Sequence, residues 1–66
     1  MTVIVNGEKV DAAEPMSLAD AVVTLTTAPT GVAAALNGDV IRRAEWPHTW
    51  LSDGDEVEVV TATQGG

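Results

Sequence analysis

The 66-residue sequence contains no cysteine, no phenylalanine and no tyrosine, and only three of its residues are Lys or Arg. Without cysteine the chain has no disulfide, no thiolate metal ligand and no nucleophilic thiol. No apolar run approaches the roughly 20 residues of a membrane span, and no charged and then apolar signal region opens the chain. We therefore expect a cytoplasmic protein that does not enter a membrane.

The charge balance excludes another class of partner. Ten Asp and Glu residues give a formal net charge of -7, which repels nucleic-acid phosphates and anionic lipid and favours a partner with a basic face. The length allows one compact domain, with little room for a deep substrate cavity. Because 45% of the residues are hydrophobic, the chain is expected to fold. We also expect it to be a monomer when it is free.

The first half of the chain predicts a hairpin and a short helix. Residues 2–6 alternate with period two and run into Asn6-Gly7, a pair typical of two-residue hairpin turns, so residues 8–11 form the return strand. Ser17 is placed as the N-cap of a helix whose apolar residues follow at i, i+3, i+4 and i+7, namely Leu18, Ala21, Val22 and Leu25. Pro29 and Gly31 are expected to end it.

The second half predicts three more strands. These are residues 32–36, then 40–41 after an Asn37-Gly38 turn, and finally 56–59 after the turn at residues 52–55. Residues 42–51 show no clean period and are interpreted as a connection with one helical turn.

Together these elements predict an α+β domain with a mixed sheet of about five strands and one helix packed on one face. Four valines, Val3, Val5, Val57 and Val59, are expected to face the helix. Ile4 and Val60 then lie on the open side, either as ordinary exposed aliphatic residues or as a docking surface.

The polar side chains do not form a self-contained active site. His48 has no second metal ligand in a recognisable pattern and is interpreted as solvated or capping, so no metal and no cofactor is expected on this chain. Ser17 has no partnering base. Arg42 and Arg43 are expected to pair with acidic neighbours on the surface.

The C-terminal Gly65-Gly66 offers different chemistry. A chance sequence, a frayed tail and a cloning remnant are bland explanations that the residues alone leave open. In the functional interpretation, glycines without Cβ atoms pass through a narrow channel in a partner. The Gly66 carboxylate then attacks an electrophilic phosphate, and joining it to AMP supplies a good leaving group that an incoming sulfur nucleophile displaces to leave a thiocarboxylate.

A combination of motifs resembles the sulfur carrier protein of thiamine biosynthesis over essentially the whole chain. The motifs are the opening strand and turn at 3–7, Leu36-Asn37-Gly38, Val40-Ile41, Arg43, Glu45-Trp46, Leu51, Asp53-Gly54-Asp55, Val57 to Val60 and Gln64-Gly65-Gly66. The resemblance implies a ubiquitin-like β-grasp domain at residues 1–62, with its first and last strands parallel at the centre of the sheet. Residues 63–66 would be a flexible Gly-Gly tail.

The resemblance also implies a function and a set of partners. An E1-like adenylyltransferase would adenylate Gly66 with ATP and Mg, and a cysteine desulfurase would supply sulfur for the thiocarboxylate. Thiazole synthase would then receive the sulfur. Gln64 and Gly65 would lie in the partners' channels, and Ile4 and Val60 are further candidate partner contacts.

Some positions depart from the family pattern, and other functions compete. Thr61 and Thr63 stand where basic and aliphatic residues are usual, and Trp50 replaces a smaller aliphatic residue, which suggests that it supplements an aromatic-poor core. The alternatives are a small subunit of molybdopterin synthase, a ubiquitin-like protein modifier joined through Gly66 to lysines, and an interaction module with an accidental tail.

Overall fold

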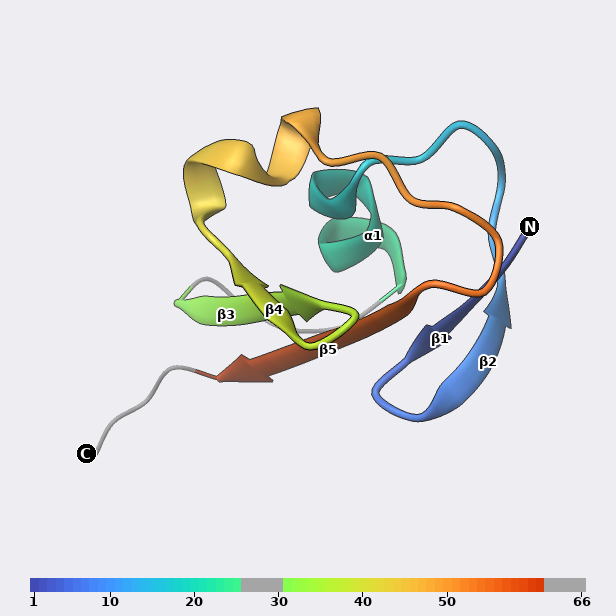
Figure 1. Ribbon diagram of the computed structural model, residues 1–66, viewed down its shortest axis with the longest axis horizontal. Helices are drawn as coiled ribbons and strands as arrows, with labels where there is room; N and C mark the ends of the chain where they lie inside the picture. Colours follow the sequence, from blue (N-terminus) through green and yellow to red (C-terminus); the bar gives the residue numbers. More distant parts are fainter. Residues whose placement is uncertain (26–30, 62–66) are drawn as a thin grey trace.

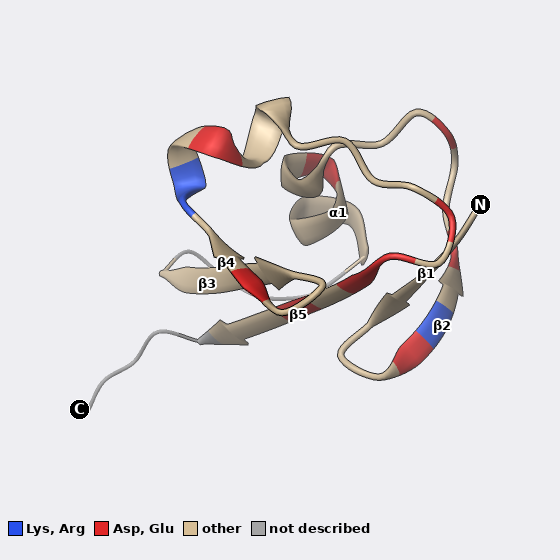
Figure 2. Cartoon of the chain, in the orientation of Figure 1, with Lys and Arg blue, Asp and Glu red and all other residues tan. Residues whose placement is uncertain are grey.

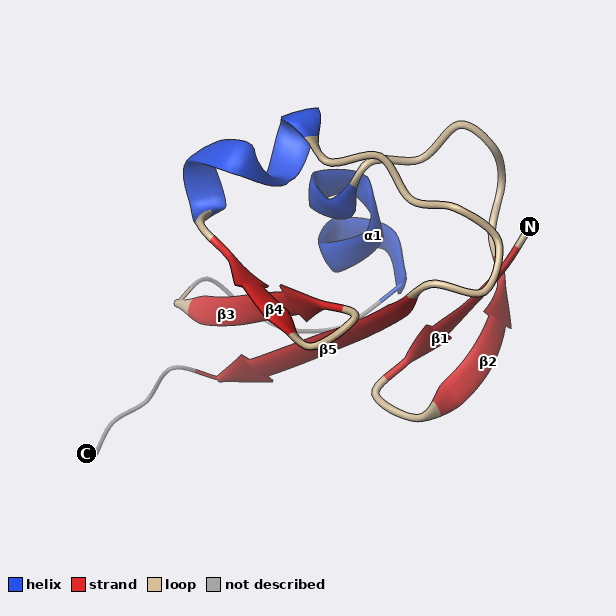
Figure 3. Ribbon diagram, in the orientation of Figure 1, coloured by secondary structure: helices blue, strands red, loops and turns tan. Residues whose placement is uncertain are grey.

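The computed structural model describes residues 1–25 and 31–61, and within them one mixed sheet carries a helix on one face (Figures 1 and 3). The elements in chain order are β1 (Thr2–Val5), β2 (Glu8–Asp11), α1 (Leu18–Leu25), β3 (Val32–Leu36), β4 (Asp39–Ile41), the 3₁₀ helix η1 (Arg43–His48) and β5 (Glu56–Thr61). The strand order in the sheet is β2-β1-β5-β3-β4. This is the β-grasp arrangement that the resemblance implies.

Two Asn-Gly pairs close the two hairpins, as the sequence predicts. Asn6 and Gly7 have φ angles of 50° and 87°, and Asn37 and Gly38 have φ angles of 51° and 89°. Positive φ at both central residues defines the tight turn whose twist matches paired strands, and Asn and Gly tolerate it better than other residues. The turns therefore set the registers of β1 against β2 and of β3 against β4.

The last strand, β5, fills the centre of the sheet. It pairs in parallel with β1 through Ile4↔Glu56 and Val5↔Val57, and antiparallel with β3 from Val32↔Thr61 to Leu36↔Val57. Sequence pattern locates strands but does not pair them, so this parallel contact was expected only through the family resemblance.

The core lies between the sheet and α1. Val3, Val5, Val57 and Val59 are buried, which confirms that these four valines face the helix. The helix contributes Leu18, Ala21 and Val22, and Leu25 packs at the margin of the same cluster. One apolar stripe on a short helix therefore covers one face of the sheet, as the i, i+3, i+4, i+7 spacing predicts.

Ser17 begins the helix as predicted. Its carbonyl oxygen accepts a hydrogen bond from Ala21 N at 3.0 Å, and its hydroxyl accepts one from Asp20 N at 3.1 Å, so it satisfies a backbone N–H of the first turn. The helix ends at Leu25. Pro29, one of the two residues predicted to end the helix, lies outside the described residues. Gly31, the other, is described and has a φ of 82°.

Only one of the two tryptophans is buried, and the expectation that Trp50 supplements the core is wrong. Trp46 in η1 is buried and donates its indole N–H to Ile41 O at 2.8 Å. Trp50 is 60% exposed and does not fill the core. Its backbone forms a bridge with Ser17, which fixes residues 49–51 beside the start of α1 and directs the Trp50 side chain outward.

Candidate functional site

The site is built around the point where β5 ends. Thr61 is the last residue of β5 and pairs with Val32, the first residue of β3, and we call this pair the tail root. Gln64, Gly65 and Gly66 lie outside the described residues, so their predicted roles stay predictions. The described residues show how the sheet holds the tail root and which surfaces flank it.

Two asparagine side chains hold β5 from opposite sides. The Asn6 side chain accepts a hydrogen bond from Val59 N at 2.9 Å and donates one to Val59 O at 3.3 Å. The Asn37 side chain accepts a hydrogen bond from Glu56 N at 2.9 Å. Each asparagine therefore has two tasks, because its positive φ shapes a hairpin turn and its amide extends the hydrogen bonding along β5.

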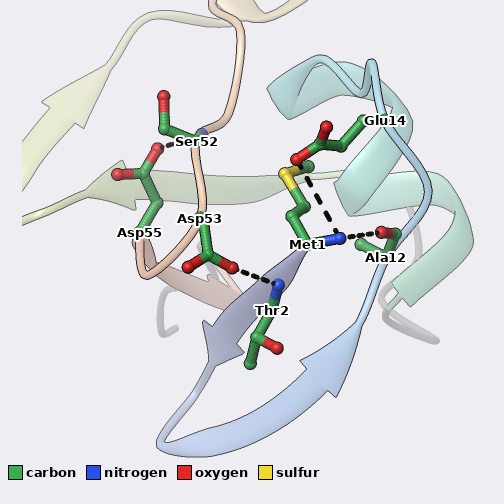
Figure 4. Close-up of polar contacts among 7 residues, drawn as sticks. All are labelled: Met1, Thr2, Ala12, Glu14, Ser52, Asp53 and Asp55. Atoms are coloured by element: carbon green, nitrogen blue, oxygen red, sulfur yellow. Dashed lines mark hydrogen bonds and ion pairs between the residues drawn. The ribbon is translucent and has the colours of Figure 1, made fainter.

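The turn at residues 52–55 anchors the other end of β5 (Figure 4). The Asp55 carboxylate accepts hydrogen bonds from Ser52 N at 2.7 Å and from Asn37 Nδ2 at 3.1 Å. Asp53 Oδ1 accepts a hydrogen bond from Thr2 N at 2.7 Å, and Thr2 O accepts one from Gly54 N at 2.7 Å. The turn thus joins β5 to the start of β1 and to the β3–β4 turn.

The same corner holds the main-chain amine of Met1 (Figure 4). This amine donates to Ala12 O at 2.9 Å and lies 4.0 Å from Glu14 Oε2. Asp53 and Asp55 are therefore structural hydrogen-bond acceptors, and Glu14 is an ion-pair partner, roles that the charge count alone does not reveal. The signal for the two aspartates in the sequence is the turn pattern Ser-Asp-Gly-Asp, since Asp in such turns accepts local backbone N–H groups.

The open face of the sheet carries an apolar hollow next to the tail root. Its lining residues are Ala33, Ala34, Ala35, Val40, Glu58 and Val60. Val60 is 59% exposed and Val40 is 76% exposed, and small alanines lie opposite them, with Ala33 paired to Val60 and Ala35 to Val40. The prediction that Val60 lies on the open side is therefore confirmed. The signal in the sequence for Ala33 and Ala35 is strand alternation along residues 32–36, which places both alanines on the open side with Val60.

Ile4 lies on β1, where it pairs with Glu56 and with Lys9. It is half-buried and does not line the hollow. The structure therefore separates the two predicted aliphatic contacts, because Val60 borders the tail root and Ile4 lies on the next strand of the sheet.

Arg42 and Arg43 lie at the start of η1. The Arg43 guanidinium carbon is 4.9 Å from the centroid of the Trp46 ring, and Arg43 Nη2 donates to Val32 O at 3.4 Å. Arg42 is exposed and its side chain does not cap η1. Neither arginine forms an ion pair with a carboxylate in the described part of the chain, so the expected pairing with acidic neighbours is wrong. Instead of pairing with a carboxylate, the Arg43 guanidinium makes a cation–π contact with the Trp46 ring.

Residues 1–25 and 31–61 contain no group of three or more His, Asp or Glu side chains that is placed to hold a metal ion. His48 is exposed at the end of η1. Among the same residues, no helix is long and apolar enough to cross a membrane.

Comparisons with known proteins agree with this geometry. The model of the ThiS family matches residues 3–66. A crystal structure of thiamine biosynthesis protein ThiS from Geobacter metallireducens is 35% identical, with a TM-score of 0.84 and complete coverage of both chains. A solution structure of a thiamine biosynthesis protein from the same organism is 35% identical, with a TM-score of 0.77, and covers 100% of this chain and 88% of its own. No curated protein matches the chain.

Proposed function

The chain belongs to the ThiS family, and from this premise we propose that it carries sulfur for thiamine biosynthesis on the carboxyl group of Gly66. The observation that carries the proposal is the full-length agreement with a thiamine biosynthesis protein, in a family match that runs to Gly66. The folded domain provides the surface that partner enzymes bind. The chain is a protein co-substrate and not an enzyme.

The chemistry has two steps, both on the backbone. A Gly66 carboxylate oxygen attacks the α-phosphorus of ATP, pyrophosphate leaves, and an acyl-adenylate forms. A sulfur nucleophile then attacks the acyl carbon and AMP leaves. Hydrosulfide gives the thiocarboxylate directly when it loses its proton, whereas an enzyme persulfide gives an acyl disulfide, from which a second thiol releases the thiocarboxylate by reducing the S–S bond. The E1-like adenylyltransferase holds ATP and Mg for the first step, and a cysteine desulfurase provides the sulfur for the second. Thiazole synthase accepts the sulfur from the loaded carrier.

The way in which the described residues hold β5 supports a carrier of this kind. The hydrogen bonds of Asn6 and Asn37 brace β5, so the sheet presents the tail root at a defined position. A defined tail root supports a reaction that another protein performs on the tail, because a partner docked on the folded domain then meets the tail at a fixed starting point.

The apolar hollow is the proposed docking surface for these partners. Val40 and Val60 present aliphatic surface beside small alanines, and Glu58 at the same hollow suits a basic residue of the partner. Ile4 is proposed as a more distant contact on β1. All these partner encounters are proposed to occur in the cytoplasm.

Intact mass spectrometry tests the proposed reaction. Incubation with an E1-like adenylyltransferase, ATP, Mg and a sulfide source should replace one oxygen of the chain by sulfur. A variant that lacks Gly66 should keep the same circular dichroism spectrum and unfolding midpoint but show no exchange. Covalent conjugates to lysines of other proteins would favour a protein modifier instead, and the absence of any adenylate or sulfur exchange would contradict the proposal.

A further inference from the structure

The arginine pair is the positive patch of a strongly acidic chain. Arg42 and Arg43 are two of only three Lys and Arg residues, against ten Asp and Glu. The third cation, Lys9, lies on β2 at the far edge of the sheet. Figure 2 shows the start of η1 as a basic segment on the side of the molecule where β5 ends.

This charge is not neutralised within the chain by an acidic side chain. The only ion pair among residues 1–25 and 31–61 joins the Met1 amine to Glu14. The two remaining segments, 26–30 and 62–66, contain no Asp or Glu. Arg42 is exposed, so its guanidinium is available to another molecule.

Arg43 is positioned at the tail root. Its Nη2 lies 3.4 Å from the carbonyl oxygen of Val32, and Val32 is the cross-strand partner of Thr61. Stacking on the buried Trp46 ring restricts the guanidinium, so little conformational entropy remains to be lost on binding. Arg43 therefore flanks the tail root from the start of η1, with exposed Arg42 next to it in the chain, whereas the apolar hollow flanks the tail root on the open face of the sheet.

We propose that Arg42 and Arg43 bind carboxylate side chains at the rim of the channel through which the activating enzyme receives the tail. The inference rests on the proposed function and adds a specificity element to it. Planar guanidinium groups match carboxylates in charge and geometry. A local attraction of this kind also offsets the general repulsion between a chain of charge -7 and an acidic rim.

The length of the tail indicates that the arginines bind a carboxylate of the partner protein and not the nucleotide. Five residues follow Thr61, and a fully extended chain of that length spans about 17 Å. In a narrow channel an extended tail carries Gly66 and its adenylate that far from the tail root. The arginines then contact the entrance of the channel and act as positioning residues, not catalytic ones.

A matched pair of variants tests the inference. Arg42→Gln and Ala13→Glu each lower the net charge by one, and Ala13 is an exposed residue in the connection between β2 and α1, away from η1. Pyrophosphate release by an E1-like adenylyltransferase that adenylates the wild-type chain is measured against carrier concentration. Arg42→Gln should raise KM for the carrier about 5-fold with kcat unchanged, whereas Ala13→Glu should stay close to wild type. The difference should shrink in about 0.5 M NaCl.

Three results would overturn the inference while leaving the proposed function intact. They are equal KM values for the two variants, a shift in KM for ATP instead of the carrier, and a higher kcat/KM for Arg42→Gln, which would mean that the arginines retain the carboxylate of their own chain. If no such enzyme adenylates the wild-type chain, the proposed function itself fails.

Discussion

At the scale of single residues, Asn37 joins three parts of the molecule. Its φ of 51° closes the β3–β4 turn, its side-chain oxygen accepts from Glu56 N, and its amide nitrogen donates to Asp55. On the other side of β5, Asn6 closes the β1–β2 turn with a φ of 50° and accepts a hydrogen bond from Val59 N. Replacing either asparagine therefore disturbs both a turn and the support of the central strand.

Asn37→Ala should lower the free energy of unfolding by about 1–2 kcal/mol, since alanine disfavours positive φ and Glu56 N loses its acceptor. Asn37→Gly keeps the backbone conformation and removes only the side-chain bonds, so it should cost less. Urea unfolding followed by tryptophan fluorescence measures both. An alanine variant as stable as the wild-type chain would show that these contacts do not matter.

Residue-level reasoning from the sequence had clear limits. Asn-Gly pairs predict turns because the φ requirement is local, but the bond from Asn6 to Val59 spans 53 positions and depends on strand pairing. Nothing local distinguishes Trp46 from Trp50 either, because residues 42–51 have no period that marks a buried face. The scarcity of Lys and Arg marks the arginine pair in the sequence, whereas the stacking of Arg43 on Trp46 depends on the fold of η1.

At the scale of elements, α1 depends on its start and on its apolar stripe. The helix has eight residues, including β-branched Val22 and Val23, so its intrinsic propensity is low and its contacts with the sheet and the N-cap decide its stability. Ser17 is the buried residue that supplies this cap.

Ser17→Ala should destabilise the protein by about 1 kcal/mol, because Asp20 N loses its side-chain acceptor. Ser17→Gly is the matched variant, since glycine is tolerated at this position and should cost only about a few tenths of a kcal/mol. Thermal unfolding monitored by far-UV circular dichroism would rank the two. The opposite order would mean that packing at this buried position outweighs capping.

The elements themselves were largely predictable from the sequence. Alternation, helical spacing and turn residues placed every strand and the helix, and β5 runs two residues further than the alternating segment to reach Thr61. The candidate site was predictable only in part. Val60 followed from alternation, whereas its neighbours Ala33 and Val40 depend on the register of β3 between β4 and β5.

At the scale of the whole molecule, two unlike surfaces flank the tail root. The apolar hollow lies on the open face of the sheet, and the arginine pair lies at the start of η1. A partner that contacts both surfaces would bind the folded domain on two sides of the tail root. The direction in which the chain continues beyond Thr61 would then be fixed relative to that partner.

Val60→Asp should weaken the encounter with a partner enzyme, since a charge in the hollow has to be desolvated when the surfaces meet. We expect about a 10-fold increase in KM for the carrier in adenylation. Val23→Asp is the control, because Val23 is 77% exposed on α1, outside the hollow, and it should leave KM near the wild-type value. Equal effects of the two variants would remove the hollow from the docking surface.

The central position of β5 also bears on when the protein becomes active during its synthesis. β1 and β3 are both bonded to β5, and Asn6 and Asn37 both need its backbone, so a nascent chain without residues 56–61 lacks the middle of its sheet. Native structure must therefore await the final stretch of translation. A truncated translation product should be degraded as an unfolded chain, and the activating enzyme that we propose as a partner would then encounter only full-length chains.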